Sequence, residues 1–120
     1  MAISDNLKRG TVELSVLTLL QKGDMYGYEI SQQLFEQSGE LYQIQESSLY
    51  PSLYRLVEKG LISDRTEKVG KRRVRVYYHL ETAGEEYLKE LKLEYLSHTA
   101  GVLRILGVKD IEGTINDINW

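Results

Sequence analysis

A chain of 120 residues is long enough for one domain with one hydrophobic core and too short for two independent ones. Its proportions of hydrophobic residues (42%) and charged residues (28%) are ordinary for a folded soluble protein. No apolar run approaches the roughly 20 residues needed to cross a bilayer, and the N-terminus lacks the apolar middle of a secretory signal. Because there is no cysteine, disulfides and thiolate metal sites are excluded, and we expect a cytoplasmic protein.

The net charge of −3 is unevenly distributed along the chain. Residues 65–75 hold six basic side chains and one acidic one, whereas residues 81–94 hold five glutamates and two lysines. A solvated charge run in a loop would give the same composition. The basic run directly follows an amphipathic segment, and this position favours contact with a polyanion over the simpler interpretation.

Two helices are predicted in the first third of the chain. The first spans Thr11–Leu20, with Thr11 as N-cap, and it is apolar nearly all round, so we expect it at the centre of the core. Gly23 and the residue after it end this segment. A second helix is predicted from about Tyr26 to Gln37, closed by a glycine.

The third helix is predicted to start at Ser47 or Ser48 as N-cap, with Pro51 in its first turn, where a missing N–H does no harm. Leucines at i, i+4 and i+7 form its buried stripe: Leu49, Leu53 and Leu56. The opposite face is predicted to expose polar side chains, flanked by two tyrosines: Ser48, Ser52, Arg55 and Lys59, with Tyr50 and Tyr54.

A two-stranded hairpin follows, with strands over residues 61–68 and 74–80 and a turn over 69–72. The predicted fold is therefore mainly α: a winged helix-turn-helix of three helices and a two-stranded β-wing, over residues 1–80. A long helix is predicted from about Thr82 to Leu106, within a segment 81–106 that precedes a tail, 107–120. Its apolar stripe has little left to cover in its own domain, so we expect a partner helix rather than packing on the same subunit. The predicted dimer interface comprises Leu88, Leu91, Tyr95, Leu96, Val102, Leu103 and Leu106.

Three motifs in order resemble the PadR family of bacterial transcriptional regulators. They are MYGYEI (residues 25–30), LYPSLYRLVEKGLI (49–62), and RVYYHL (75–80) followed by Gly84. The resemblance covers about residues 7–106. It implies a homodimer held by the C-terminal helix, with the third helix in a major groove and the wing on the backbone or minor groove. It also implies repression of transcription, relieved by a small molecule or another signal. The chain departs from the family at Glu81, where a threonine is usual, which leaves the start of the fourth helix open.

The predicted partner is double-stranded DNA carrying an inverted repeat. Arg72 and Arg73 at the wing tip are expected to contact the backbone, with Lys71 and Arg75 in support. On the third helix, Ser48 and Ser52 are candidates for base contacts, and Arg55 for either a guanine or a phosphate. Hydroxyls that could bond phosphates are those of Tyr26, Tyr50 and Tyr54.

Other functions have little support in the sequence. The two histidines have no carboxylates at ligand spacing, and no nucleophile or phosphate-loop motif is present, so we predict no metal, no cofactor and no enzyme activity. The main alternative is a winged helix that binds proteins instead of DNA. A small aromatic effector would bind beside the C-terminal helix, in a pocket lined by Tyr95, Leu96 and Trp120.

Overall fold

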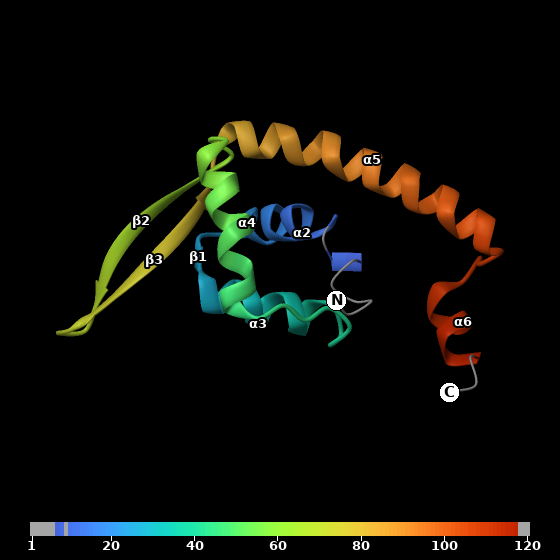
Figure 1. The fold of residues 1–120 in the computed structure, drawn as a ribbon, viewed down its shortest axis with the longest axis horizontal. Coiled ribbons are helices and arrows are strands. Elements are labelled where there is room, and N and C mark those ends of the chain that lie inside the picture. Colours follow the sequence, from blue (N-terminus) through green and yellow to red (C-terminus); the bar gives the residue numbers. More distant parts are fainter. Residues whose placement is uncertain (1–6, 9, 118–120) are drawn as a thin grey trace. The chain divides into compact units, whose positions relative to one another are not determined.

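The computed structural model describes residues 7–8 and 10–117, and the chain divides into two compact units, Met1–Lys89 and Glu90–Trp120. Its elements follow one another as predicted for a winged helix with a long C-terminal helix, which confirms the fold class (Figure 1). None of the described helices is both long and apolar enough to cross a membrane. In chain order the elements are α2 (Val12–Leu20), β1 (Met25–Tyr26), α3 (Gly27–Gln37), α4 (Glu46–Glu58), β2 (Ile62–Val69), β3 (Arg73–Leu80), α5 (Thr82–Leu106) and α6 (Ile111–Asp117).

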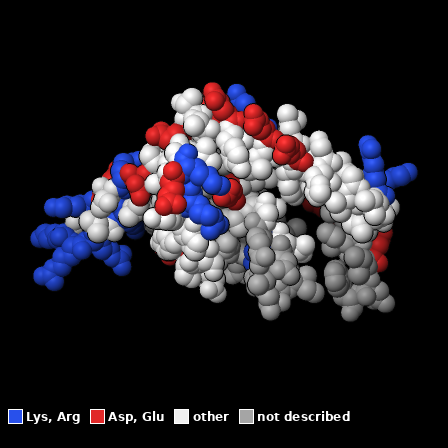
Figure 2. Space-filling view, turned by 45° about the horizontal axis from the view of Figure 1, so that its top comes forward, with Lys and Arg blue, Asp and Glu red and all other residues white. Residues whose placement is uncertain are grey.

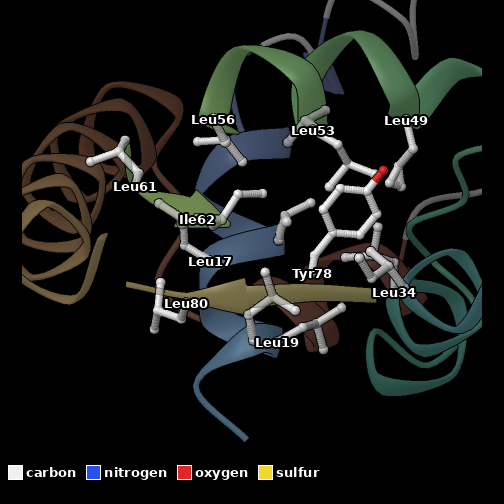
Figure 3. Close-up of a cluster of buried hydrophobic side chains, with 14 of the residues drawn as sticks. Leu17, Leu19, Leu34, Leu49, Leu53, Leu56, Leu61, Ile62, Tyr78 and Leu80 are labelled. Atoms are coloured by element: carbon white, nitrogen blue, oxygen red, sulfur yellow. The ribbon is translucent and has the colours of Figure 1, made fainter. Parts of the chain in front are cut away.

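Side chains of α2, α3 and α4 meet those of the sheet in the core of the first unit (Figure 3). The leucine stripe of α4 is completely buried, at 0% exposure for Leu49, Leu53 and Leu56. Each such leucine stabilises the fold by about 1.5–3 kcal/mol relative to an exposed one. Since α2 buries five of its nine residues, it lies at the centre of this core as predicted. The packing fixes α4 against the sheet and so sets the distance between the helix and the wing.

The sheet has three antiparallel strands, in the order β1-β3-β2, and not two. The additional strand pairs Met25 with Tyr78 and Tyr26 with Tyr77. The helix predicted from about Tyr26 to Gln37 is α3, Gly27–Gln37, and Tyr26 is its N-cap, with an extended backbone (φ −92°, ψ 166°) that also forms part of β1. Its N–H donates to the Glu29 Oε1 atom at 3.2 Å, which closes the start of α3. A strand of two residues is too short to show an alternating pattern in the sequence.

Helix α4 begins at Glu46, so the predicted N-caps Ser47 and Ser48 lie inside the helix. Pro51 consequently lies in the second turn and not in the first. The carbonyl of Ser47 has no N–H donor four residues later, which weakens the helix at this point. The buried leucines compensate, because the stability of a protein helix depends mainly on the packing of its apolar face.

The start of α5 is fixed by the loop between α4 and β2. The Glu81 N–H donates to the Leu61 carbonyl at 3.1 Å, and the helix begins at Thr82, which settles the start that the sequence left open. Gly84 packs directly on this loop, since a Cβ there would overlap the Leu61 carbonyl oxygen. Leu88 is 2% exposed and belongs to the core of the first unit, so its place in the predicted dimer interface is wrong.

The second unit contains the remainder of α5 and a short helix, α6, in the tail whose structure the sequence did not predict. Of the predicted interface residues, Leu91 and Leu103 are half-buried within the chain. Several large apolar side chains of this unit are exposed, including two on α5 that the sequence analysis did not select, Leu93 and Ile105. The exposed members of the predicted set are Tyr95, Leu96, Val102 and Leu106.

Candidate nucleic-acid interface

The exposed face of α4 lies opposite its leucine stripe. Ser47, Pro51 and Tyr54 each precede a buried leucine by two residues, which is about 200° around the helix. All are exposed, and Tyr54 is 66% exposed. This face therefore offers a hydroxyl, a proline ring and a phenol to a ligand. Ser47 was predicted as an N-cap and not as a residue that contacts a ligand.

The predicted position of Ser52 on the exposed face is wrong. Ser52 is 6% exposed, and its hydroxyl accepts a hydrogen bond from Arg55 Nη2 at 3.1 Å. Ser52 is three residues after Leu49 and four before Leu56, so helical spacing places it on the buried side. Arg55 itself is exposed but inclines toward α2, with its Nε 3.9 Å from a carboxylate oxygen of Glu13. Ser48 is exposed on the same flank of the helix as Arg55.

Tyr50 lies on the other flank of α4, against the first residue of α3. Its hydroxyl donates to Glu46 Oε1 at 2.6 Å, and this hydrogen bond raises the pKa of Tyr50 to about 12. The ring packs so closely that a Cβ on Gly27 would lie 3.0 Å from the hydroxyl oxygen. Tyr50 therefore remains protonated, joins α4 to α3, and has its hydroxyl hydrogen already donated.

Positive charge is concentrated at the wing. Figure 2 shows Lys and Arg side chains gathered at the projecting tip of the hairpin. Among the described residues, no carboxylate lies within 4.0 Å of the basic groups of this surface, which we call the wing cations: Lys68, Lys71, Arg72, Arg73 and Arg75. A narrow loop at Gly70 (φ 79°) brings the two strands together, so these side chains share one small region.

Arg65 belongs to the basic run in the sequence but is neutralised in the structure. Its Nη1 is paired with Asp24, and its Nε donates to Glu67 Oε1 at 2.9 Å. Asp24 Oδ1 also accepts a hydrogen bond from His79 Nδ1 at 2.7 Å. The hydrogen bond with His79, supported by Arg65, holds the pKa of the Asp24 carboxyl below its usual value. This cluster ties the turn before β1 to both strands of the wing, a role that the sequence did not reveal.

A second contact between the wing and the helices is aromatic. The Arg75 guanidinium lies 4.2 Å from the centre of the Tyr26 ring, and that ring meets Tyr77 edge to face at 5.5 Å. Beside this stack a cavity of about 340 Å³ opens between β3, the start of α3 and the start of α4. Tyr28 and Glu46 line it from the helices, while Arg73 and Arg75 line it from the wing. The sequence selected Tyr26, Arg73 and Arg75 separately, and the structure brings them together.

The described residues contain no group of three or more His, Asp or Glu side chains arranged to hold a metal ion. Of the predicted effector pocket, Tyr95 and Leu96 lie exposed on α5, and Trp120 is outside the described residues. A separate groove of about 310 Å³ lies between α2 and α3 and is lined mainly by Leu14, Leu19, Leu34 and Tyr42, with polar side chains at its edge.

Comparison with known proteins agrees with this geometry. Residues 16–90 match the model of the "Transcriptional regulator PadR-like family". A transcriptional regulator from Clostridium thermocellum has a similar structure, with a TM-score of 0.73 and 35% identity over 82% of this chain and 95% of that one. The negative transcriptional regulator PadR of Bacillus subtilis is 30% identical over 79 residues, which are 66% of this chain and 43% of that protein.

The Bacillus subtilis PadR structure was solved in complex with operator DNA. It has a TM-score of 0.63 and 30% identity, over 69% of this chain and 46% of that one. The matched family model extends from the middle of α2 into the first turns of α5, so it includes both α4 and the wing. The family is one of transcriptional regulators and not of enzymes, as expected from the sequence. The chain belongs to the PadR-like family of transcriptional regulators.

Proposed function

We propose that this regulator binds double-stranded DNA, with α4 in a major groove and the wing on the neighbouring backbone or minor groove. The observation that carries the proposal is the group of five wing cations, none paired with a described carboxylate, beside a helix with an exposed face. Guanidinium and ammonium groups in this position would neutralise phosphates and release counterions. The structure of Bacillus subtilis PadR in complex with operator DNA supports DNA as the ligand. Because it would bind chromosomal DNA, the protein would act in the cytoplasm.

Within this mode, the residues of α4 and of the wing would have different tasks. The exposed residues of α4, Ser47, Ser48 and Tyr54, would contact base edges, because the major groove presents a distinct pattern for each base pair. Arg55 would reach either a base or a phosphate. The wing cations would fix position without selecting sequence.

We further propose a homodimer held by the exposed apolar side chains of α5. A large exposed apolar stripe on a separate helix is typical of a protein–protein contact. Two-fold symmetry would place two half-sites about 34–36 Å apart, one helical turn of DNA, and would require an inverted repeat. The protein would act as a repressor, as does the negative transcriptional regulator PadR of Bacillus subtilis.

Relief of repression would follow if a signal favoured an arrangement of the two DNA-binding units that does not fit the operator. An effector needs only to bind that arrangement more tightly, and its effect equals the difference in affinity. Tyr95 and Leu96, which lie exposed on α5, would line its site.

Selection from a random duplex library at moderate salt tests the DNA-binding proposal. We expect enrichment of an inverted repeat with one-turn spacing. The double variant Arg72→Ala/Arg73→Ala should bind bulk duplex more weakly, with a salt slope lower by about two, because two phosphate contacts are lost. Clean wild-type protein that neither enriches a sequence nor binds bulk duplex would contradict the proposal and favour a winged helix that binds proteins.

A further inference from the structure

We propose that the cavity between the wing and the N-terminal ends of α3 and α4 is a fixed seat for one phosphate of the DNA backbone, with Arg75 and Arg73 as its ligands. This inference rests on the proposed function and adds to it the identity of the site between the helix and the wing. We call the residues that line it the phosphate seat: Tyr26, Tyr28, Glu46, Arg73 and Arg75.

The position of the cavity follows the path that the DNA strand must take. A helix in the major groove and a wing at the adjacent minor groove are separated by one sugar–phosphate strand. The seat is lined by Glu46 at the start of α4 and by Arg73 and Arg75 on the wing strand β3. Figure 1 shows β1 and the start of α3 between β3 and the lower end of α4. A strand that passes between α4 and the wing would therefore cross this cavity.

Arg75 is held in place without being neutralised. Its guanidinium stacks on Tyr26 at 4.2 Å, and Tyr26 is in turn fixed by strand pairing with Tyr77 and by its edge-to-face contact with that ring. Arg65 also lies on an aromatic ring, but its charge is neutralised, because it is paired with Asp24 and Glu67. An arginine that is already ordered loses less side-chain freedom on binding than one at the tip of a loop. Arg75 should therefore bind a phosphate at a smaller entropic cost than an arginine at the tip of the loop.

Glu46 gives the seat an unexpected negative charge. Its carboxylate accepts the Tyr50 hydroxyl at 2.6 Å and so is fixed at the wall of the cavity. Two guanidinium groups and one carboxylate leave a net charge of about one positive unit to meet a phosphate. Glu46 should consequently lower the affinity for DNA of any sequence, so that its removal strengthens binding.

The test measures the affinity of the full-length chain for a random-sequence duplex by fluorescence anisotropy across a range of NaCl concentrations. Arg75→Ala should lower the slope of log K against log salt by up to about 0.9, because one of the two guanidinium groups that hold this phosphate is lost. Tyr26→Leu should weaken binding about two- to tenfold with the slope unchanged, because Arg75 keeps its charge but loses its order. Tyr26→Phe retains the ring on which Arg75 stacks and should therefore weaken binding less than Tyr26→Leu does. Glu46→Gln, whose amide oxygen still accepts the Tyr50 hydroxyl, should strengthen binding up to about fivefold.

Arg72→Ala at the wing tip separates the two proposals. If wild-type protein binds duplex and Arg72→Ala weakens it, whereas Arg75→Ala and Glu46→Gln leave both affinity and slope unchanged, the seat is wrong and the wing proposal stands. If the wild type does not bind duplex at all, the proposed function fails, and the seat fails with it. Thermal unfolding of each variant checks that loss of the ring in Tyr26→Leu has not unfolded β1. If it has, Arg75→Lys, which keeps the charge but not the planar stacking group, should show the same weakening at an unchanged slope.

Discussion

Replacement of Gly84 by alanine tests how α5 is attached to the first unit. In an exposed helix interior this change stabilises a protein, because alanine has the higher helix propensity by about 1 kcal/mol. At Gly84 the added methyl group would overlap the Leu61 carbonyl oxygen and lie 2.7 Å from Leu80 Cδ1. The leucine side chain is able to rotate away, but the carbonyl belongs to the backbone of the loop between α4 and β2. The helix would therefore have to move as a whole.

The expected cost is the balance of these two effects. Inserting one extra carbon into a packed site costs about 1–3 kcal/mol, and a backbone obstacle puts Gly84 at the upper end of that range. After the gain in helix propensity is subtracted, the free energy of unfolding should fall by about 2 kcal/mol. For a unit of this size, Met1–Lys89, such a loss corresponds to a decrease in Tm of roughly 8–16 °C.

Gly101, on the same helix, provides the matched control. A Cβ at Gly101 meets nothing within 4 Å, so Gly101→Ala should be neutral or slightly stabilising. Both variants are measured by urea denaturation followed by circular dichroism at one fixed protein concentration, because dimer formation would make stability depend on concentration. If Gly84→Ala is as stable as Gly101→Ala, the close contact between α5 and the Leu61 loop is not a determinant of the fold, and the reasoning above is refuted.

Two further predictions concern the wing and the second unit. Asp24→Asn should destabilise the protein at neutral pH. The hydrogen bonds of Asp24 to His79 and Arg65 lower its pKa in the folded state below its ordinary value of 3.8. The stabilisation by the Asp24 carboxylate is therefore complete above pH 3.8 and is lost as the pH falls through the folded-state pKa. Unfolding curves of variant and wild type should therefore converge in acid, and a difference that is constant across the acid range would exclude this cause. Val102→Glu should convert the proposed dimer to a monomer in light scattering, whereas Leu93→Glu should not, because Leu93 is more exposed (69% against 42%) but lies off the stripe. Equal behaviour of the two variants would remove the stripe as the interface.

The helices and the wing hairpin could be predicted because their signals are local. Buried leucines repeat at helical spacing in α4, and the long helix was predicted with the bounds that the structure has, Thr82–Leu106. Strand β1 has only two residues, so it has no periodicity, and it forms because Tyr26 pairs with Tyr77, which is distant in the sequence. Elements of this kind are determined by tertiary contacts rather than by their own sequence.

The exposed face of α4 was partly misassigned for a related reason. Spacing at i, i+4 and i+7 identifies the centre of a buried stripe but not its width. Ser52 lies next to the leucines at i+3 and is buried because α4 packs against both α2 and α3. Because α4 begins at Glu46, Ser47 lies inside the helix, on its exposed face, and is not the N-cap. A prediction that counted i+3 neighbours as buried would have avoided the error.

Counting basic residues also gave an incomplete description of the wing. In the sequence, Arg65 and Arg75 are equivalent members of one run, but the structure gives them opposite roles. Arg65 is paired with Asp24, 41 residues away in the sequence, so its charge is neutralised within the protein. Arg75 stacks on the Tyr26 ring and has no described carboxylate within 4.0 Å, so its charge remains available while its position is fixed. Since both partners lie in the short segment around β1, that segment decides which arginines of the wing are left for a ligand. The electrostatic character of the interface thus depends on residues 24–26 as much as on the basic run itself.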